Sequence, residues 1–281
     1  NKLKQAAQQC AQGSRLLFLG CGSGRLEIPF LEGLKQNNLE VHIVDVNKAF
    51  IGRFIEKIKN KTVSVKVHHG AMEEFWERHP DEKFDIITAF FVLYLLPQWH
   101  EVVFRMISGL NSGGYFLLAE ETGDLAGGDP AGGGGSDLLN LVNFIRGCLG
   151  NPCDFHSAQT LGILKESLHR LEKAGFVKLT TIELTWENNQ VSYSEYLDVM
   201  TGAKKALGSS LYLPVKLRKA VREKFACWSQ KSDKVKVRGG HRIWIVQLKE
   251  EPQKVANAYL RCHHILFSQT DHLAMWRSVR G

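Results

Sequence analysis

The chain has 281 residues and a formal net charge of +7, and it is 44% hydrophobic and 23% charged. These values exclude a disordered or fibrous chain, and the length suffices for one large domain or for a domain with a sizeable insertion. The apolar run 86–96 is too short and too often interrupted to predict a membrane span. Six scattered cysteines without a Cys-x-x-Cys pair favour reduced thiols, and therefore a cytoplasmic or nuclear location.

The first informative stretch is 16–19, where four consecutive apolar residues predict a strand buried on both faces. A Gly-x-Gly-x-Gly turn follows at once, and the apolar residues from Leu26 onward predict a helix after it. Strand, turn and helix together form the first unit of a parallel α/β sheet. The glycines either serve only a tight turn, or they also let a ligand contact bare backbone. The turn consists of Gly20, Cys21, Gly22, Ser23 and Gly24.

The residues after this turn narrow the choice of ligand. The dinucleotide fingerprint requires a glycine where Arg25 stands, and the phosphate-binding loop requires a Lys-Ser or Lys-Thr pair that is missing. A second strand, 41–44, ends in Asp45, an acid placed to accept hydrogen bonds from ribose hydroxyls. The glycine turn and this acid together resemble the class I S-adenosylmethionine-dependent methyltransferases, which use S-adenosyl-L-methionine as their cofactor.

The resemblance implies a set of cofactor contacts. The glycine turn would lie against the methionine part of the cofactor, and Asp45 would hold the ribose, with Val46 next to it. After a third strand at 63–67, the family often carries an acid that binds the adenine, but this sequence has Ala71 there, followed by Met72. The adenine is therefore expected to be held by backbone and by Met72, unless the register differs by one or two residues. The end of the fourth strand, 84–90, adds Ala89 and Phe90.

Candidate catalytic residues follow the fourth and fifth strands, because ligands in such folds bind outside the carboxyl ends of the strands. Tyr94 follows the fourth strand, and Glu120 and Glu121 end the fifth strand, which begins near Tyr115. Methyl transfer is an in-line displacement that depends on alignment, and a hydroxyl acceptor also needs a base. The alternatives are that Tyr94 completes the core and that the two acids are exposed strand-end residues.

The predicted fold class is α/β, with a Rossmann-like, doubly wound, seven-stranded and mostly parallel sheet. The sixth strand is expected at 176–186 and the last at 241–248, with a helical insertion before the last strand. We expect a methyltransferase domain at 1–250 that includes a helical lid at 187–240, and a C-terminal extension at 251–281. This order and spacing is loosely similar to that of histamine N-methyltransferase.

The insertion is strongly basic. Residues 203–242 carry twelve Lys or Arg side chains and two acids, within a segment where helices are predicted at 193–207 and 214–228. Such a face either attracts an anionic substrate or nucleic acid, or is a solvated helical face. The first functional hypothesis is methyl transfer to a nitrogen or oxygen of a small molecule. The alternatives are an RNA or protein methyltransferase that docks through 203–242, and a catalytically inactive cofactor-binding scaffold.

Two further segments have simpler interpretations. Cys262, His263, His264 and His272 meet no structural zinc spacing, so we expect surface histidines and no metal there. The glycine-rich stretch 123–136 is typical of a flexible linker, and its part 132–136 has the sequence of an engineered splice.

Overall fold

The structure is a computed structural model that describes residues 4, 7–8, 15–34, 39–59, 61, 63–93, 96, 98–122, 158–192 and 234–278. Of these, only the backbone is described at 120–122, 158–161, 184–192, 234–241 and 267–278. The chain divides into two compact units. The first comprises 1–120, 159–182 and 243–281, and the second comprises 121–158 and 183–242.

Strands and helices alternate along most of the chain, as the sequence predicts. Their bounds are β1 (Arg15–Leu19), α2 (Glu27–Leu31), β2 (Leu39–Asp45), α3 (Lys48–Ile58), β3 (Val63–His69), α4 (Met72–Arg78), β4 (Phe84–Phe90), α5 (Trp99–Ser108), β5 (Leu110–Thr122), α7 (Ala158–Lys173), β6 (Val177–Ser192), β7 (Lys234–Leu248) and α10 (Pro252–Ser278).

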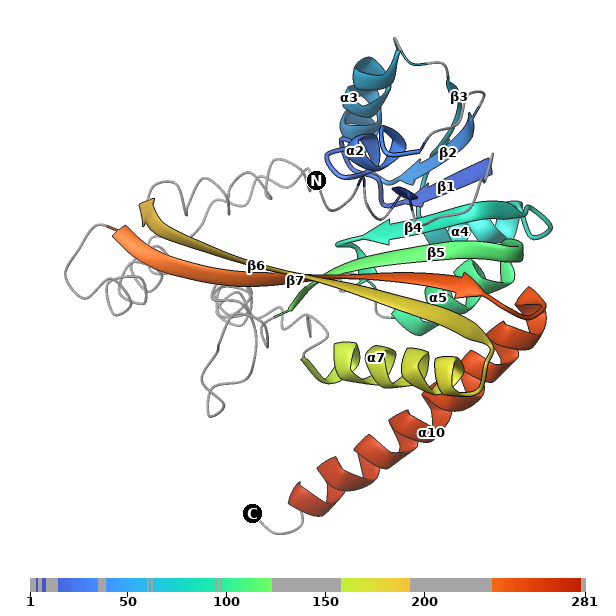
Figure 1. Cartoon of the computed structure of the whole chain (residues 1–281), viewed down its shortest axis with the longest axis vertical. Coiled ribbons are helices and arrows are strands. Elements are labelled where there is room, and N and C mark those ends of the chain that lie inside the picture. The colour runs from blue at the N-terminus through green and yellow to red at the C-terminus, as the bar shows by residue number, and fades with distance from the viewer. Residues whose placement is uncertain are drawn as a thin grey trace. The chain divides into compact units, whose positions relative to one another are not determined.

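The strands form one seven-stranded sheet in the order β3-β2-β1-β4-β5-β7-β6. The pairs β1–β2, β1–β4, β2–β3 and β4–β5 are all parallel. Figure 1 shows that β7 runs in the direction opposite to β4. The Lys249 N–H donates to the carbonyl of Phe176, and this hydrogen bond joins the end of β7 to the start of β6. The predicted Rossmann-like, mostly parallel sheet is therefore confirmed.

Both faces of β1 are buried, because successive side chains of a strand point to opposite faces. On one face, Phe18 packs against Phe30 of α2 and Phe54 of α3, with ring centroids 6.4 and 6.3 Å apart. On the other face, Leu17 and Leu19 join a core built with α4, α5, α7 and α10. The sheet is thus covered by helices on both faces, which holds the loops at its carboxyl edge in fixed positions.

The start of β5 differs from the prediction. The sequence predicts a glycine turn at 110–114 before a strand that begins near Tyr115, but the strand begins at Leu110 and includes these residues. Its irregularity remains as a register shift against β4, with Gly113 at φ +76°. The Asn111 amide donates to the Asp85 carboxylate at 2.7 Å, so a side chain replaces one regular contact between the two strands. The predicted turn is therefore a bulge rather than a break in the strand.

The last two strands are longer than predicted, since β6 continues to Ser192 and β7 begins at Lys234. Neighbouring strands satisfy each other's backbone groups, so polar side chains beyond the predicted ends can remain in strand conformation. Within the second unit, Arg242 donates from Nη2 to the carboxylate of Glu183 at 2.8 Å. The predicted helices at 193–228 and the glycine-rich stretch 123–136 lie outside the described residues, and the predicted domain boundaries stay predictions.

The C-terminal segment corrects another expectation. His263 was expected at the surface, but it is only 4% exposed. Its ring is stacked on His100 of α5, with centroids 4.5 Å apart, and it packs edge-on against Trp99. Tyr259, one helical turn earlier on α10, is fully buried as well. The segment is therefore a helix with a buried face, in which the spacing of four residues places His263 on the core side.

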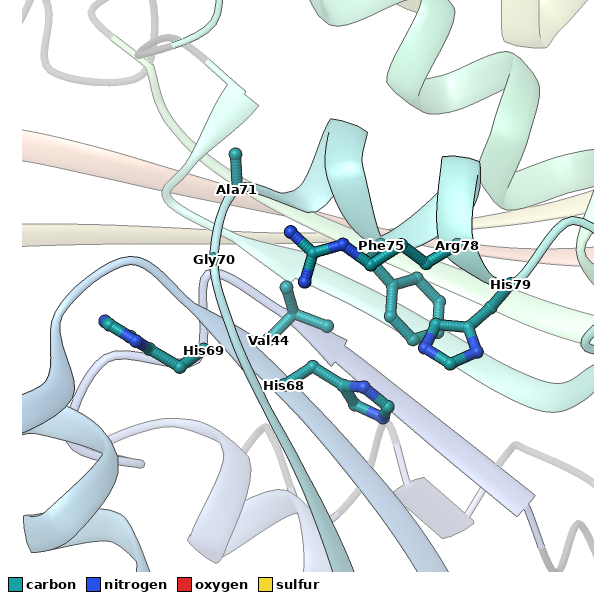
Figure 2. A pocket seen from close by; sticks show the side chains of 8 residues that line it. All are labelled: Val44, His68, His69, Gly70, Ala71, Phe75, Arg78 and His79. Atoms are coloured by element: carbon teal, nitrogen blue, oxygen red, sulfur yellow. The ribbon is translucent and has the colours of Figure 1, made fainter.

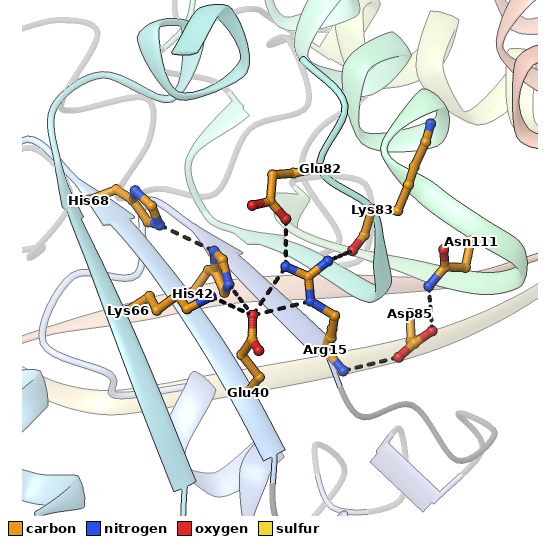
Figure 3. Close-up of polar contacts among 9 residues, drawn as sticks. All are labelled: Arg15, Glu40, His42, Lys66, His68, Glu82, Lys83, Asp85 and Asn111. Atoms are coloured by element: carbon orange, nitrogen blue, oxygen red, sulfur yellow. Dashed lines mark hydrogen bonds and ion pairs between the residues drawn. The ribbon is translucent and has the colours of Figure 1, made fainter. Parts of the chain in front are cut away.

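An ionic network joins the starts of the central strands at the edge opposite their carboxyl ends (Figure 3). The Arg15 guanidinium donates to the carboxylates of Glu40 and Glu82, and its backbone N–H donates to Asp85. The hydrogen bond from His42 and those from Lys66 and Arg15 lower the pKa of Glu40 to about 2. This network fixes one edge of the sheet. The loops at the other edge, outside the carboxyl ends of the strands, are where such sheets bind ligands.

Candidate functional site

Three strands end side by side at the carboxyl edge of the sheet. Leu19 of β1 pairs in register with Val44 of β2 and with Ala89 of β4. The loops after these strands therefore start from the same line, and the structure brings the glycine turn, Asp45 and the end of β4 together. In open α/β sheets this edge is where ligands bind.

All three glycines of the turn have left-handed backbone conformations, with φ of +62° at Gly20, +52° at Gly22 and +73° at Gly24. A Cβ on Gly20 would lie 2.6 Å from Val92, and one on Gly24 would lie 2.6 Å from Phe54. A Cβ on Gly22 would meet nothing within 4 Å. Two of the glycines thus allow close packing inside the protein, whereas Gly22 presents bare backbone to open space.

The Asp45 carboxylate connects the turn to the end of β2. One oxygen accepts the Gly22 N–H at 2.7 Å, and the other accepts the Asn47 N–H at 2.7 Å. Asp45 is 9% exposed, and Lys57 of α3 donates to the carbonyl of Ser23 at 2.9 Å. The acid predicted to hold the ribose therefore also fixes the glycine turn, and each of its oxygens retains a further lone pair that can accept a hydrogen bond.

The next residue, Val46, is 67% exposed, which is unusual for a valine beside a buried strand. His69 Nε2 lies 3.2 Å from the Val46 carbonyl oxygen, and the Gly70 N–H donates to the carbonyl of Asp45 at 3.1 Å. These contacts tie the ends of β2 and β3 together. They leave the valine side chain as an apolar surface beside Asp45, where a flat ring can pack.

A hollow opens between the ends of β2 and β3 and helix α4 (Figure 2). Ala71, one of the predicted adenine contacts, lines it, and Figure 2 shows the Arg78 guanidinium reaching toward Gly70. Met72 is placed differently, because it is buried in the core on the α4 side. The other lining residues are Val44, His68, His69, Phe75 and His79.

Several predicted contacts have buried side chains, namely those of Cys21, Ala89 and Phe90. A ligand at these positions would meet backbone, as the glycine turn already requires. Burial, with smaller contributions from Glu27 and Asp45, raises the pKa of the Cys21 thiol, so this cysteine stays protonated and unreactive.

The described residues do not test the three predicted catalytic side chains. Tyr94 lies outside the described residues, and the backbone alone is described at Glu120 and Glu121, which belong to β5. Their roles therefore stay predictions.

Two residues of interest were missed by the sequence reasoning. Glu27, the first residue of α2, is 3% exposed, and burial raises the pKa of its carboxyl to about 8. The signal was its spacing of three and four residues from Phe30 and Leu31, which are both buried and so place Glu27 on the inner face of the helix. Phe91, directly after β4, has φ +55°, a strained conformation for a bulky residue, and strain of this kind gathers at functional sites.

No described helix combines the length and the apolar character needed to cross a membrane. Among the described side chains, no group of three or more His, Cys, Asp or Glu residues is arranged to hold a metal ion.

Comparisons with known proteins agree with this geometry. Residues 16–114 match the family described as "Methyltransferase domain". A segment of 116 residues is 28% identical to the carboxy-S-adenosyl-L-methionine synthase of Campylobacter lari, covering 39% of this chain and 45% of that enzyme. The chain thus spans less than half the length of this curated relative. The YcgJ protein of Bacillus subtilis, 17% identical, has the same fold, with a TM-score of 0.54 over 89% of this chain and 97% of its own.

Proposed function

Because residues 16–114 form a methyltransferase domain of the class I S-adenosylmethionine-dependent superfamily, we propose that the protein transfers a methyl group from S-adenosyl-L-methionine to a nitrogen or oxygen atom of a small molecule. The observation that carries the proposal is the open backbone of Gly22 beside the buried carboxylate of Asp45, at the carboxyl edge of the sheet. The Campylobacter lari relative is named as a synthase of a carboxylated derivative of the same cofactor. This name supports a sulfonium nucleoside as the ligand here.

The residues present fit this cofactor. Left-handed Gly22 leaves room for the methionine part to contact bare backbone, and Asp45 offers carboxylate lone pairs to ribose hydroxyls. The exposed Val46 side chain gives the adenine a surface to pack on. Cofactor-binding roles are proposed for Gly20, Cys21, Gly22, Ser23, Gly24, Asp45, Val46, Ala71, Met72, Ala89 and Phe90.

The chemistry needs little more than alignment. When bound, the cofactor supplies a methyl group already activated on a sulfonium. The chain fixes that end of the site through the hydrogen bonds of Asp45 to Gly22 and Asn47, so that a correctly held acceptor meets the methyl carbon in line. The acceptor's proton has to go to a base, for which Tyr94, Glu120 and Glu121 are the proposed candidates.

Two measurements test the proposal. Equilibrium binding of S-adenosyl-L-methionine to the full chain should give a defined dissociation constant, and methyl-labelled cofactor incubated with fractionated cell extract should place label in a small metabolite. Label in RNA or polypeptide would instead favour an RNA or protein methyltransferase that docks its substrate through 203–242. Binding without any labelled product would favour the inactive scaffold, and absence of binding would refute the proposal.

A further inference from the structure

Two carboxylates flank the glycine turn, and neither is paired with a cation in the part of the chain that the structure describes. Glu27 is 3% exposed and Asp45 is 9% exposed. Among the described residues, no Lys, Arg or His forms an ion pair with either, and Glu27 is held by the backbone N–H groups of residues 26 and 27, with that of Leu26 at 3.3 Å. Lys57 is near enough to influence Glu27, but its ammonium donates to the carbonyl of Ser23.

Buried carboxylates are normally paired, bound to a metal, or held neutral by a proton. Metal coordination has no support here, because the described residues contain no group of three metal-ligating side chains. Two solutions therefore remain at this turn, which are a proton on Glu27 or a cationic ligand. The methyl donor carries a positive charge on its sulfur, whereas the thioether left after methyl transfer does not.

We propose that Glu27 makes the cofactor site distinguish the cationic methyl donor from its neutral thioether product, by releasing a proton when the donor binds. The inference rests on the proposed function, since it takes the ligand to be a sulfonium nucleoside. Binding the donor sends the carboxyl proton to solvent, and the carboxylate balances the sulfonium. After the methyl group has left the sulfur, the carboxylate takes a proton back from solvent, and the product is held less tightly.

The groups around Glu27 support a protonated carboxyl in the ligand-free protein. Burial raises its pKa to about 8, although the backbone hydrogen bonds at residues 26–27 act in the opposite direction. The charge of Asp45 at the end of β2 raises the pKa further, and that of Lys57 on α3 lowers it. A further titratable neighbour is the buried thiol of Cys21, which is uncharged.

The sign of the pH dependence follows from this protonation. If the donor lowers the pKa of Glu27, donor affinity rises with pH by up to about tenfold per unit below pH 8, and it levels off above pH 8. The thioether product does not lower that pKa, so its affinity does not rise with pH for this reason. The ratio of donor affinity to product affinity therefore increases between pH 6 and pH 8.

Isothermal titration calorimetry on the full chain tests this, with S-adenosyl-L-methionine and S-adenosyl-L-homocysteine as ligands from pH 6 to 9.5. Two buffers of different ionisation enthalpy give the number of protons released. The α-amino group of the ligand titrates near pH 8 as well. Its contribution is common to all variants, so the matched comparison is wild type against Glu27→Gln, with the exposed acid Glu56→Gln as a control.

We expect Glu27→Gln to abolish the extra proton release with the donor and to reduce the preference for donor over product about tenfold, and Glu56→Gln to change neither. Equal proton release with the two ligands, or a pH step that persists in Glu27→Gln, would overturn the role of Glu27 while leaving the proposed function standing. Failure of wild type to bind either ligand would overturn both. If Glu27→Gln does not fold, the difference in proton release between the two ligands in wild type, corrected for the separately titrated α-amino group of each ligand, decides the question.

Discussion

Replacing Gly22 by alanine separates ligand contact from fold stability. Gly22 has φ +52°, and an added Cβ meets nothing within 4 Å. The variant therefore carries the cost of a left-handed alanine, about 1–2 kcal/mol, without a steric clash inside the protein. In a ligand complex, however, the new methyl group occupies the space next to Asp45, where the cofactor is proposed to contact backbone.

Gly113 provides a matched control at the other edge of the sheet. It has φ +76°, and an added Cβ there also meets nothing within 4 Å. Gly113→Ala should therefore lose the same 1–2 kcal/mol or so of unfolding free energy as Gly22→Ala. The two variants differ only in their position relative to the proposed cofactor site.

Urea unfolding and calorimetric titration with S-adenosyl-L-methionine compare the two variants directly. We expect similar unfolding free energies, with at least a tenfold loss of cofactor affinity in Gly22→Ala and little change in Gly113→Ala. Equal affinity in both variants would show that Gly22 does not face the ligand. A much larger stability loss in Gly22→Ala would show that the space beside it is filled by protein.

Three further predictions concern the same unit. Asp45→Asn can accept only one of the two backbone N–H groups well, so it should lose about 1–3 kcal/mol in urea unfolding and bind the cofactor more weakly by calorimetry. Gly24→Ala places a Cβ 2.6 Å from Phe54, so it should lose about 2–4 kcal/mol, and Phe54→Leu in the same chain should restore part of it in thermal melts. Burial, and then the charges of His42 and a second histidine, lower the pKa of His68 to about 4. The folded state thus binds fewer protons than the unfolded state between pH 6.5 and 4. The urea midpoint should therefore decrease as the pH is lowered across this window, and it should decrease less in His68→Gln.

Each of these has a result that contradicts it. Unchanged stability in Asp45→Asn would mean that its hydrogen bonds do not fix the turn. A Gly24→Ala variant as stable as Gly22→Ala would remove the distinction between the packed and the open glycine. A urea midpoint that falls equally steeply in wild type and His68→Gln would assign the acid sensitivity to other groups, such as His263, whose pKa burial also lowers to about 4.

The half of the fold around β1 could be predicted because local signals there agree with tertiary structure. Four apolar residues at 16–19 require burial on both faces, and only glycines tolerate the turn that follows. The acid at Asp45 ends a strand whose register is fixed by its apolar neighbours. Sequence order then places both at one edge of the sheet, since parallel strands share a direction.

What the sequence could not supply depends on contacts between distant segments. The burial of His263 follows from the packing of α10 on α5, two segments that lie far apart in the sequence. The environment of Glu27 depends on Asp45 and Lys57, from two other elements. The strain at Phe91 arises where its N–H must reach the carbonyl of Ala119, at 2.7 Å. In each case the property of the residue is set by a contact with a distant segment, and the residue type alone does not reveal it.

The described groups of the proposed donor end come from one uninterrupted piece of chain, from Gly20 to Phe91. The core under this piece also needs α5, α7 and α10, so only segments outside that core can change while the piece keeps its geometry. Chains that differ in those outer segments can then present a methyl group in the proposed way to different recipients. The match to the family described as "Methyltransferase domain" ends at residue 114, beyond which such variation has most room.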